Sequence, residues 1–551
     1  MQSDLSALKL LVSGIRLSLD DDDEKAIELA LRKLKKSGIR SAPASCRIYK
    51  KSVDARKRDD LHFVCVVLAA FSGDVRLPSA AVLESAGIRF LDEGSFDLSF
   101  GTLPMRGRPM VVGMGPAGLF AALFLAQNGY EPILIDRGSS VEDRVKDTER
   151  FFRDGILDPD SNVQFGAGGA GTFSDGKLVT RIRDPLCRSV LETFVRFGAP
   201  EEILVKAKPH VGTDLLRGVV SGMLHEIERL GGRLIYRCRL LDFTECADGS
   251  VRAHTTKGDF SCGVLILAIG HSARDTYEKL LEKSFSLEPK PISVGVRVEH
   301  LQSEIDNSLY GKFAGHPKLG HAEYSLSDTK GARGVYTFCM CPGGEVVAAA
   351  SEAGGLVVNG MSRHARDGRN ANAAVAVSVE PSDIPPVEGS PIRGAIAFQR
   401  KLERAAFAAG GGDYIAPIMT LGDFLSGKRG TEPTRILPSY RGGMVKVSDF
   451  ASVYPEFVLQ GLRYGFASFG KQLKGYDTPD AVLTAAETRT SAPLRILRDA
   501  ISRAALGHPA IYPCGEGAGY AGGITSAAVD GLRSALEIMK QYAPMKGEDT
   551  L

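Results

Sequence analysis

The stretch PMVVGMGPAGLFAALFLAQNGYEPILID, residues 109–136, decides the fold of this chain. Its pattern predicts a short apolar strand, a glycine turn, a helix and a second apolar strand that ends on an acid. The spacing Gly113-x-Gly115-x-x-Gly118 falls between strand and helix, where a dinucleotide fingerprint belongs. Gly113 permits the tight turn, Gly115 lets the backbone approach a pyrophosphate, and Gly118 lets the helix pack closely on the strand. We therefore predict a βαβ nucleotide-binding unit.

The acid that ends the second strand supports this interpretation. Asp136 lies 23 residues after Gly113, near the roughly 20 expected for an acid that accepts from ribose hydroxyls. The N–H groups of the first helical turn and the helix dipole would face the phosphates. A glycine turn in an ordinary α/β protein is the plain alternative, but strand, turn, helix, strand and acid in register favour a nucleotide. The expected ligands are Gly113, Gly115, Pro116, Ala117, Gly118, Asp136 and Arg137.

Length and composition set the frame. The unit begins after about a hundred of 551 residues, so we expect a separate N-terminal domain and three or four domains in all. With 44% hydrophobic and 24% charged residues and a net charge of +2, the chain does not have the composition of a protein that binds nucleic acid over its whole surface. No apolar run approaches the roughly 18 residues that span a bilayer, and the N-terminus carries no signal peptide pattern.

The cysteines and the other chemistry-bearing residues exclude several classes of site. Nine cysteines are scattered without a CxxC pair, so neither a disulfide framework nor a zinc ribbon is indicated. We also find no Ser/His/Asp triad and no metal-ligand constellation in the sequence. A reducing cytoplasm is the expected compartment.

The first hundred residues have the pattern of a small α+β domain. Acids at 20–24 mark a helix start and Gly38 is a plausible stop. The order βαββαβ predicts a ferredoxin-like fold over residues 1–100. The expected strands are 9–19, 46–51, 61–69 and 88–91, with helices near 24–37 and 79–86.

This N-terminal region is also locally basic. Between Arg32 and Arg58 there are eleven basic residues and one acid, Asp54. A basic domain of this kind can contact RNA, although no aromatic pattern for stacking bases is present. Because Lys33, Lys35 and Lys36 are also what a solvated helix face contains, that plainer interpretation is favoured and a nucleic-acid contact through residues 32–58 stays open.

Two other stretches match GxGxxG formally. Residues 166–171 follow no convincing strand and open no amphipathic helix, so they fail the context test. Residues 517–522 follow a strand and precede a helix, but only eleven residues remain after Lys540, too few for a second strand and a ribose acid. The sequence therefore gives no support for a separate NAD(P) domain.

The C-terminal strand and helix can instead complete the first unit. In flavoproteins of the glutathione-reductase type, a late strand ending in Gly-Asp meets the ribityl chain, and the next helix points its N-terminus at the flavin ring. This chain resembles them, with Gly515-Glu516 in that place and a helix starting near Gly523, whose N–H groups would stabilise a reduced flavin. Residues 264–275 resemble the middle strand of the same family. FAD is therefore favoured over NAD, with further ligands Ala268, Gly270, Gly515, Glu516, Gly522, Gly523 and Ile524.

Longer motifs carry a closer resemblance. They include SNVQFGAGGAGTFSDGKL, KPHVGTD, GHSARDT, YTFCMCPGGEVV, VVNGMS, RDGRNANAAV, ETRTSAP and YPCGEGAGYAGGITSAAVDG. With residues 109–129 they resemble a family of uncharacterised bacterial-type FAD-dependent dehydrogenases over nearly the whole chain. One departure is Ala167, where the family's FGEGGAGTF has Glu, so a carboxylate function there is in doubt. The resemblance implies a fold and a cofactor but no substrate.

The resemblance further implies that the glycine-rich loop lies against the flavin or its phosphates. Gly168, Gly169 and Thr172 are the expected contacts, because backbone approaches a planar ring most easily where residues lack Cβ. A glycine-rich surface loop is the alternative. Arg144, in the helix after the ribose acid, either pairs with a phosphate or belongs to a solvated helix face.

The sequence changes character after residue 288. Short β-branched or alternating segments separated by turns predict strands at 293–300, 322–327, 335–341, 345–351, 356–361 and 373–379. With a helix at 395–409 and a linker at 381–391, they resemble the substrate domain of two-domain flavoproteins, which would roof the flavin. We thus predict an α/β chain with an N-terminal ferredoxin-like domain (1–100), a three-layer Rossmann-type FAD-binding domain (101–288 and 486–551) and a β-rich substrate domain (289–485) inserted in it.

Four residues are candidates for catalysis. Cys339 and Cys341 share a strand face in an i, i+2 pattern and suit redox chemistry, although two small apolar cysteines in a buried strand explain them as well. His271 is a general acid beside the flavin or a structural histidine. Arg489, within Glu487-Thr-Arg-Thr490, is an anion clamp or a member of a core ion pair.

The function that follows is an FAD-dependent oxidoreductase that passes hydride between a small-molecule substrate and flavin N5. Two alternatives stay open. One is a flavoprotein that modifies tRNA, with the basic N-terminal domain as its RNA-binding module. The other is a non-catalytic flavin redox sensor. Substrate, electron partner and oligomeric state are not encoded in any motif we recognise.

Overall fold

The computed structural model describes residues 8–91 and 98–545. Residues 1–7, 92–97 and 546–551, at the edges of the expected N- and C-terminal domains, lie outside the described residues. The chain divides into two compact units. The first holds residues up to 96 together with 200–210 and 306–322, two segments that the sequence had placed in later domains; the second holds the rest.

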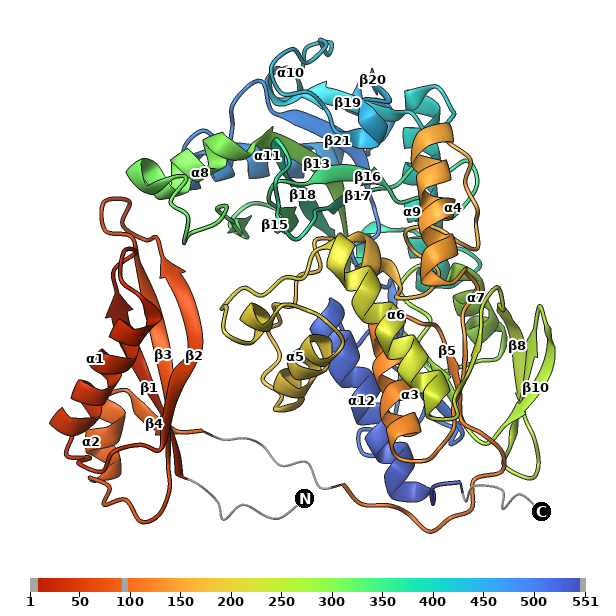
Figure 1. The fold of residues 1–551 in the computed structure, drawn as a ribbon. Helices are drawn as coiled ribbons and strands as arrows, with labels where there is room; N and C mark the ends of the chain where they lie inside the picture. The colour runs from red at the N-terminus through yellow and green to blue at the C-terminus, as the bar shows by residue number, and fades with distance from the viewer. Residues whose placement is uncertain (1–7, 92–97, 546–551) are drawn as a thin grey trace. The chain divides into compact units, whose positions relative to one another are not determined.

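The first unit is one sheet with two helices. Its elements follow the expected order βαββαβ, and its strands are all antiparallel in the order β2-β3-β1-β4 (Figure 1). One face of α1 is buried through Ala26, Ala30 and Leu34, and Gly38 follows the helix with φ +95°. The bounds are β1 (Leu8–Leu17), α1 (Asp23–Lys36), β2 (Ser45–Asp54), β3 (His62–Phe71), α2 (Ala80–Ser85) and β4 (Ile88–Phe90).

A five-stranded parallel sheet forms the base of the second unit. Its order is β23-β11-β5-β6-β7, so the strand of the glycine fingerprint, β5, lies at the centre. Its strands are short, and β5, β6, β11 and β23 are buried along their whole length, as expected for a parallel sheet covered on both faces. The bounds are β5 (Met110–Val112), β6 (Ile133–Ile135), β7 (Arg233–Ile235), β11 (Leu265–Leu267) and β23 (Ile511–Pro513).

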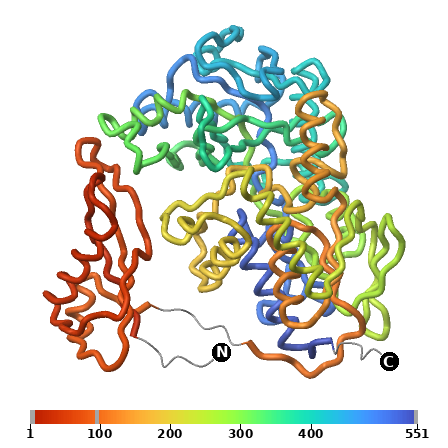
Figure 2. The backbone as a smooth tube through the Cα atoms, viewed as in Figure 1, coloured from red at the N-terminus to blue at the C-terminus, as the bar shows by residue number. Residues whose placement is uncertain are grey.

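Two helices far apart in sequence pack together beside this sheet. Figures 1 and 2 show the C-terminal helix α12 (Ile524–Gln541) beside α3 (Pro116–Gln127). They approach so closely that a Cβ on Gly531 would lie 2.0 Å from the backbone oxygen of Ala117. The last strand and helix therefore complete the nucleotide unit, as predicted. The other helices of this region are α4 (Val141–Asp154), α5 (Leu186–Arg196), α6 (Thr213–Arg229) and α7 (Arg274–Glu282).

A seven-stranded mixed sheet makes up most of the remaining part. Its order is β14-β15-β18-β13-β21-β19-β20, antiparallel except for β19 and β20. Of the six strands expected here, the segment 322–327 is irregular except for its last residue, which begins β14. The bounds are β13 (Ile292–Leu301), β14 (Ser327–Asp328), β15 (Val335–Cys341), β18 (Asn370–Val379), β19 (Ala416–Thr420), β20 (Val445–Val447) and β21 (Val482–Glu487).

Helix α9 (Pro391–Gly410) shows how local sequence sets an element. Ser390 caps it by accepting from the N–H of Arg393, Pro391 occupies the first turn, and Gly411 ends it in the left-handed conformation. The remaining elements are β8 (Leu240–Glu245), β9 (Val251–Thr255), β10 (Gly258–Cys262), β12 (Leu287–Pro289), β16 (Glu345–Ala348), β17 (Val358–Met361), β22 (Leu494–Ile496), α8 (Gln302–Tyr310), α10 (Leu421–Ser426) and α11 (Glu456–Gln472). None of the helices among the described residues is long and apolar enough to cross a membrane.

Candidate active site

One cavity of about 310 Å³ brings the predicted site residues together. This volume is typical of ligand pockets, which span about 300–1,000 Å³. All four catalytic candidates, His271, Cys339, Cys341 and Arg489, line it. So do most of the predicted cofactor ligands, namely Gly113, Gly115, Pro116, Ala117, Asp136, Gly169, Ala268, Gly270, Glu516, Gly522, Gly523 and Ile524.

The glycine fingerprint has the geometry that its chemistry requires. Gly113 has φ +105°, and a Cβ there would lie 2.3 Å from the backbone oxygen of Ala268. A Cβ on Gly118 would lie 1.9 Å from the oxygen of Gly113, so only glycine lets α3 pack this closely. Gly115 caps the helix ahead of Pro116, and its Cβ position has only Gly169 nearby, at 3.8 Å. The turn therefore leaves its own backbone open to the cavity.

The acid at the end of β6 is fixed by the same turn. Asp136 accepts from the N–H of Met114 at 2.8 Å and from that of Gly138 at 2.8 Å. Its side chain is 7% exposed and lines the cavity. A carboxylate oxygen accepts more than one hydrogen bond, so this acid has acceptor capacity left for a ligand hydroxyl.

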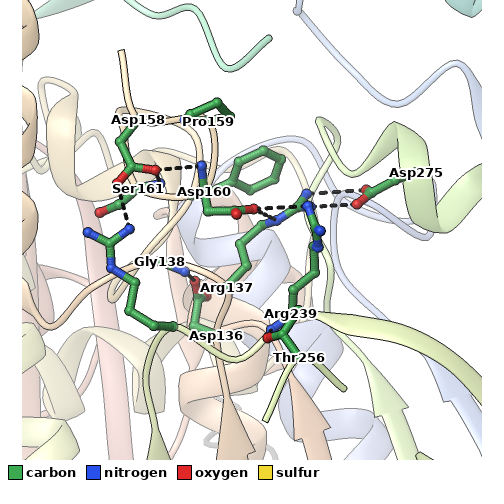
Figure 3. Close-up of polar contacts among 12 residues, drawn as sticks. Asp136, Arg137, Gly138, Asp158, Pro159, Asp160, Ser161, Arg239, Thr256 and Asp275 are labelled. Atoms are coloured by element: carbon green, nitrogen blue, oxygen red, sulfur yellow. Dashed lines mark hydrogen bonds and ion pairs between the residues drawn. The ribbon is translucent and has the colours of Figure 1, made fainter. Parts of the chain in front are cut away.

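Arg137 is turned away from the cavity into a salt-bridge network (Figure 3). Its guanidinium lies between Asp160, 3.1 Å from Nε, and Asp275, 2.5 Å from Nη2. It also stacks over the Phe165 ring, 4.4 Å from the centroid. Arg239 binds the same oxygen of Asp160 at 3.3 Å. The network ties the loops around Asp136 together, so Arg137 supports the site instead of lining it.

Arg144 is neither a cavity residue nor part of a solvated helix face. Its side chain is fully buried and does not line the cavity. It donates to the backbone oxygens of Asn162, Val163, Gly166, Ala167 and Gly169, at 2.7 to 3.3 Å. Burial lowers its pKa. The solvated-face alternative is therefore wrong, because the helix face is covered by the glycine loop, whose shape Arg144 holds. A phosphate contact from Arg144 stays a prediction.

Four more predicted ligands lie behind the cavity wall. Gly118, within α3, packs against the turn at Gly113, and a Cβ on Gly515 would lie 2.7 Å from the Cβ of Ala117 in the same helix. Thr172 is buried, and a Cβ on Gly168 would lie 2.0 Å from its hydroxyl oxygen. These residues shape the wall that Gly169 presents, and direct ligand contact from them stays a prediction.

The end of the last strand adds an acid with unusual acidity. Burial raises the pKa of Glu516 to about 7, although the nearby Lys290 opposes the shift. Glu516 lines the cavity beside the first turn of α12, which begins after Gly523. An acid with this pKa exchanges a proton near neutral pH.

At the cavity wall, Arg489 belongs to a buried ion-pair network. Its Nε and Nη2 donate to the two oxygens of Glu403, each at 3.1 Å. Arg274 also binds Glu403, at 2.7 Å. Burial favours the neutral acid, but Arg489 and Arg274 outweigh it and hold the pKa of Glu403 below its usual range. The geometry shows a core ion pair that also borders the cavity.

His271 is neutral beside this network. Burial, together with the charges of Arg489 and Arg274, lowers the pKa of His271 to about 4. Its Nδ1 lies 3.0 Å from the hydroxyl of Ser272. At neutral pH the imidazole carries no positive charge, so it orients or accepts hydrogen bonds but does not act as a cationic acid.

The two cysteines do not share a strand face as predicted. A β-bulge interrupts β15 between Phe338 and Cys341, and Cys339 has φ +43°. Cys339 is exposed while Cys341 is buried, with its thiol 3.3 Å from the backbone oxygen of Cys339. Burial raises the pKa of the Cys341 thiol to about 12, so this thiol is protonated at neutral pH.

The bulge rests on a second buried pair. Arg297, fully buried in β13, donates to both oxygens of Glu487 at 2.9 and 3.2 Å. It also donates to the backbone oxygen of Cys339 at 2.8 Å and to the side-chain oxygens of Asn359 and Asn372. Its five N–H groups are thereby used. The negative charge of Glu487 is thus paired with Arg297, and Glu487 is not a free carboxylate.

Comparison with known proteins identifies the family. Residues 291–490 match a family described as "FAD-dependent protein, C-terminal domain-like". An uncharacterized protein of Clostridium beijerinckii (strain ATCC 51743 / NCIMB 8052) is 45% identical over 549 residues, which cover 97% of this chain and 99% of that protein. The chain belongs to this family of uncharacterised FAD-dependent proteins. Its cofactor is FAD.

Solved structures are similar only at low level. The halogenase PltM is 10% identical, with 79% of this chain and 68% of that chain covered and a TM-score of 0.36. CtdE in complex with FAD is 9% identical, with 78% and 83% covered and a TM-score of 0.29. Thioredoxin reductase of Lactococcus lactis is 14% identical, with 30% and 36% covered and a TM-score of 0.18. Likeness at this level does not establish a shared function.

The cavity fits the cofactor of the family. A Cβ at Gly270, Gly522 or Gly523 would have no atom within 4 Å, and one at Gly115 only Gly169. These four glycines line the cavity, so the wall lacks side chains over the stretch that a flat ring and a pyrophosphate need. Asp136, which also lines the cavity, supplies the acceptor that ribose requires.

Several cavity residues were missed from the sequence. Lys177 and Asn359 line the cavity. Arg297 holds the roof of the cavity, by which we mean the wall around Cys339 that Lys177, Phe338, Cys341, Asn359 and Glu487 also line. Lys177 and Asn359 do lie within the quoted motifs GTFSDGKL and VVNGMS, which was the available signal. Arg297 lies in an ordinary strand pattern, and its partner Glu487 is 190 residues away, so no local pattern identifies it.

Proposed function

We propose that this protein is an FAD-dependent oxidoreductase acting on a small molecule that binds between the flavin and the seven-stranded sheet. The observation that carries the proposal is one cavity lined by the fingerprint turn, the last strand and helix, and the roof around Cys339. The finer names, a three-layer Rossmann-type domain and an N-terminal ferredoxin-like domain, belong to the same proposal and rest on strand order. We also place the protein in the cytoplasm.

FAD supplies hydride or electron transfer at its isoalloxazine ring. The chain's own groups do the rest. Glu516, whose pKa lies near 7, takes up or releases a proton at the cavity wall. The N–H groups that open α12 favour negative charge in front of them. The ion pairs Arg297–Glu487 and Arg489–Glu403 hold two parts of the cavity wall in place. Each arginine is paired with a carboxylate, so neither leaves an uncompensated charge.

The test is spectroscopic. We expect the purified protein to be yellow and its visible absorbance to bleach when NADH, NADPH or a member of a panel of small organic substrates is added without oxygen. Return of the absorbance in air would show turnover. A colourless protein that takes up no FAD would contradict the proposal, and bound flavin that no donor or acceptor alters would favour a redox sensor.

A further inference from the structure

The acceptors on the roof of the cavity already take part in hydrogen bonds. Both oxygens of Glu487 are held by Arg297. Asp175, another acid on the wall, accepts from Arg366 at 3.0 and 2.6 Å and also from the hydroxyl of Ser362. A ligand that approaches from the cavity therefore meets carboxylates that are already committed.

The backbone oxygens of the bulge are committed as well. That of Cys339 accepts from Arg297 at 2.8 Å and from the thiol of Cys341 at 3.3 Å. The oxygen of Met340 accepts from the ammonium of Lys177. The strained turn at Cys339 is thus held from two sides, and each of these carbonyls already accepts a hydrogen bond.

Three groups on this roof, those of Lys177, Asn359 and Cys339, keep N–H or S–H hydrogens that have no partner among the described residues. Lys177 uses one of its three N–H groups, on Met340. The side-chain oxygen of Asn359 accepts from Arg297 and from the N–H of Gly360, each at 2.8 Å. This fixes the amide so that its NH₂ points away from Arg297, and among the described residues it has no partner. Cys339 adds an exposed thiol, a weak donor.

The charge of Lys177 also favours an anionic ligand group at this position. Among the described residues, Lys177 forms no ion pair with a carboxylate. Arg489, in contrast, is paired with Glu403, and His271 is neutral. Asp175, on the wall, and Glu323 share the single guanidinium of Arg366, so this group of three carries one negative charge that the ammonium of Lys177 balances. The selectivity therefore comes from directed donors and a contacting ammonium, not from a general positive field.

We infer that Lys177 and the amide of Asn359 bind a carboxylate of the substrate, so that the substrates of this enzyme are organic acids. This rests on the proposed function and specifies its substrate class. A neutral amide of the same shape offers one carbonyl oxygen and places an NH₂ donor where the carboxylate has its second oxygen, so one donor of the site loses its acceptor and the charge attraction is lost, which costs binding free energy. Phe338 and Gly360 line the cavity beside them and leave room for an apolar body.

The experiment uses the FAD-loaded protein and two probes of equal shape, benzoate and benzamide. Binding is followed by the change in the flavin absorption spectrum. We expect benzoate to bind more tightly than benzamide by about 10- to 100-fold, the value of one or two charge-assisted hydrogen bonds. Lys177→Met should remove that preference, and Lys177→Arg should keep most of it.

Two further variants separate this site from a general charge effect. Asn359→Asp keeps an oxygen for Arg297 but replaces the NH₂ by a second oxygen, so benzoate binding should be lost while FAD remains bound. Lys146→Met makes the same change in net charge as Lys177→Met on the outside of α4, where the side chain is 74% exposed. It should leave the benzoate affinity unchanged.

The outcomes are distinct. Yellow protein that binds benzoate and benzamide equally, that binds neither, or that keeps its benzoate preference in Lys177→Met overturns the organic-acid inference while FAD binding stands. Colourless wild-type protein contradicts the proposed function itself.

Discussion

At the scale of single residues, the site depends on ionisable groups that other groups hold in one charge state. Arg297 with Glu487, and Arg489 with Arg274 and Glu403, are buried and hydrogen-bonded. Within residues 8–91 and 98–545, Glu516 has no such ion-pair partner, and burial raises its pKa. The two kinds of group make opposite predictions when they are replaced.

Removing one member of a buried pair should be costly. Arg297→Met leaves Glu487 uncompensated in the interior, and we expect the free energy of unfolding in urea to fall by about 3–5 kcal/mol. Arg229→Met removes an arginine that is 66% exposed and pairs with Glu226, and it should cost about 1 kcal/mol or less. The double change Arg297→Met with Glu487→Leu should regain much of the loss. Equal costs for the two single variants would contradict this account of the pair.

Glu516 predicts a pH dependence of stability. Its folded pKa of about 7 lies above the ordinary 4.5, so between these values the folded state binds more protons than the unfolded state. The raised pKa of Glu516 therefore contributes to the free energy of unfolding below about pH 4.5, and this contribution is lost as the pH rises to about 7. In urea unfolding of the FAD-free chains, Glu516→Gln should gain stability relative to wild type between pH 5 and pH 8. A difference that does not change with pH would show that the carboxyl is already ionised at pH 5.

At the scale of elements, the nucleotide turn is a matter of backbone contact. Helix α3 packs on the turn of Gly113 and on α12 with no room for a side chain at Gly118 or Gly531. The sequence predicted this unit because glycine spacing reports local geometry. It predicted β15 but not its bulge, because the alternation of Cys339 and Cys341 is the same with and without an extra residue.

Two helical glycines offer a matched test of that packing. Gly118→Ala would place a Cβ 1.9 Å from the oxygen of Gly113, and we expect a loss of about 1–3 kcal/mol or more in the free energy of unfolding, together with weaker FAD binding. Gly218→Ala in α6 meets no atom within 4 Å and should gain up to about 1 kcal/mol. If both variants unfolded like wild type in urea, the close packing of α3 would be wrong.

At the scale of the whole molecule, distant segments assemble one cavity. The glycine fingerprint at residues 113–118, the loop near Gly169, β15 and the start of α12 all contribute to it. The predicted cofactor wall could be named from sequence because each part has a local motif. The supporting contacts could not, since Arg274 meets Glu403 129 residues away and Arg144 is covered by a loop whose path the sequence does not reveal.

The measurement that tests the central claim most directly is calorimetric titration of FAD into the FAD-free chain. We predict one FAD per chain for wild type. Gly115→Ala, whose backbone (φ −76°, ψ 179°) accepts alanine and whose Cβ has room, should unfold like wild type. Its affinity for FAD should be at least about tenfold weaker, because the Cβ stands where the pyrophosphate approaches. A wild-type chain that binds no FAD, or a Gly115→Ala chain that binds it equally well, would contradict the account.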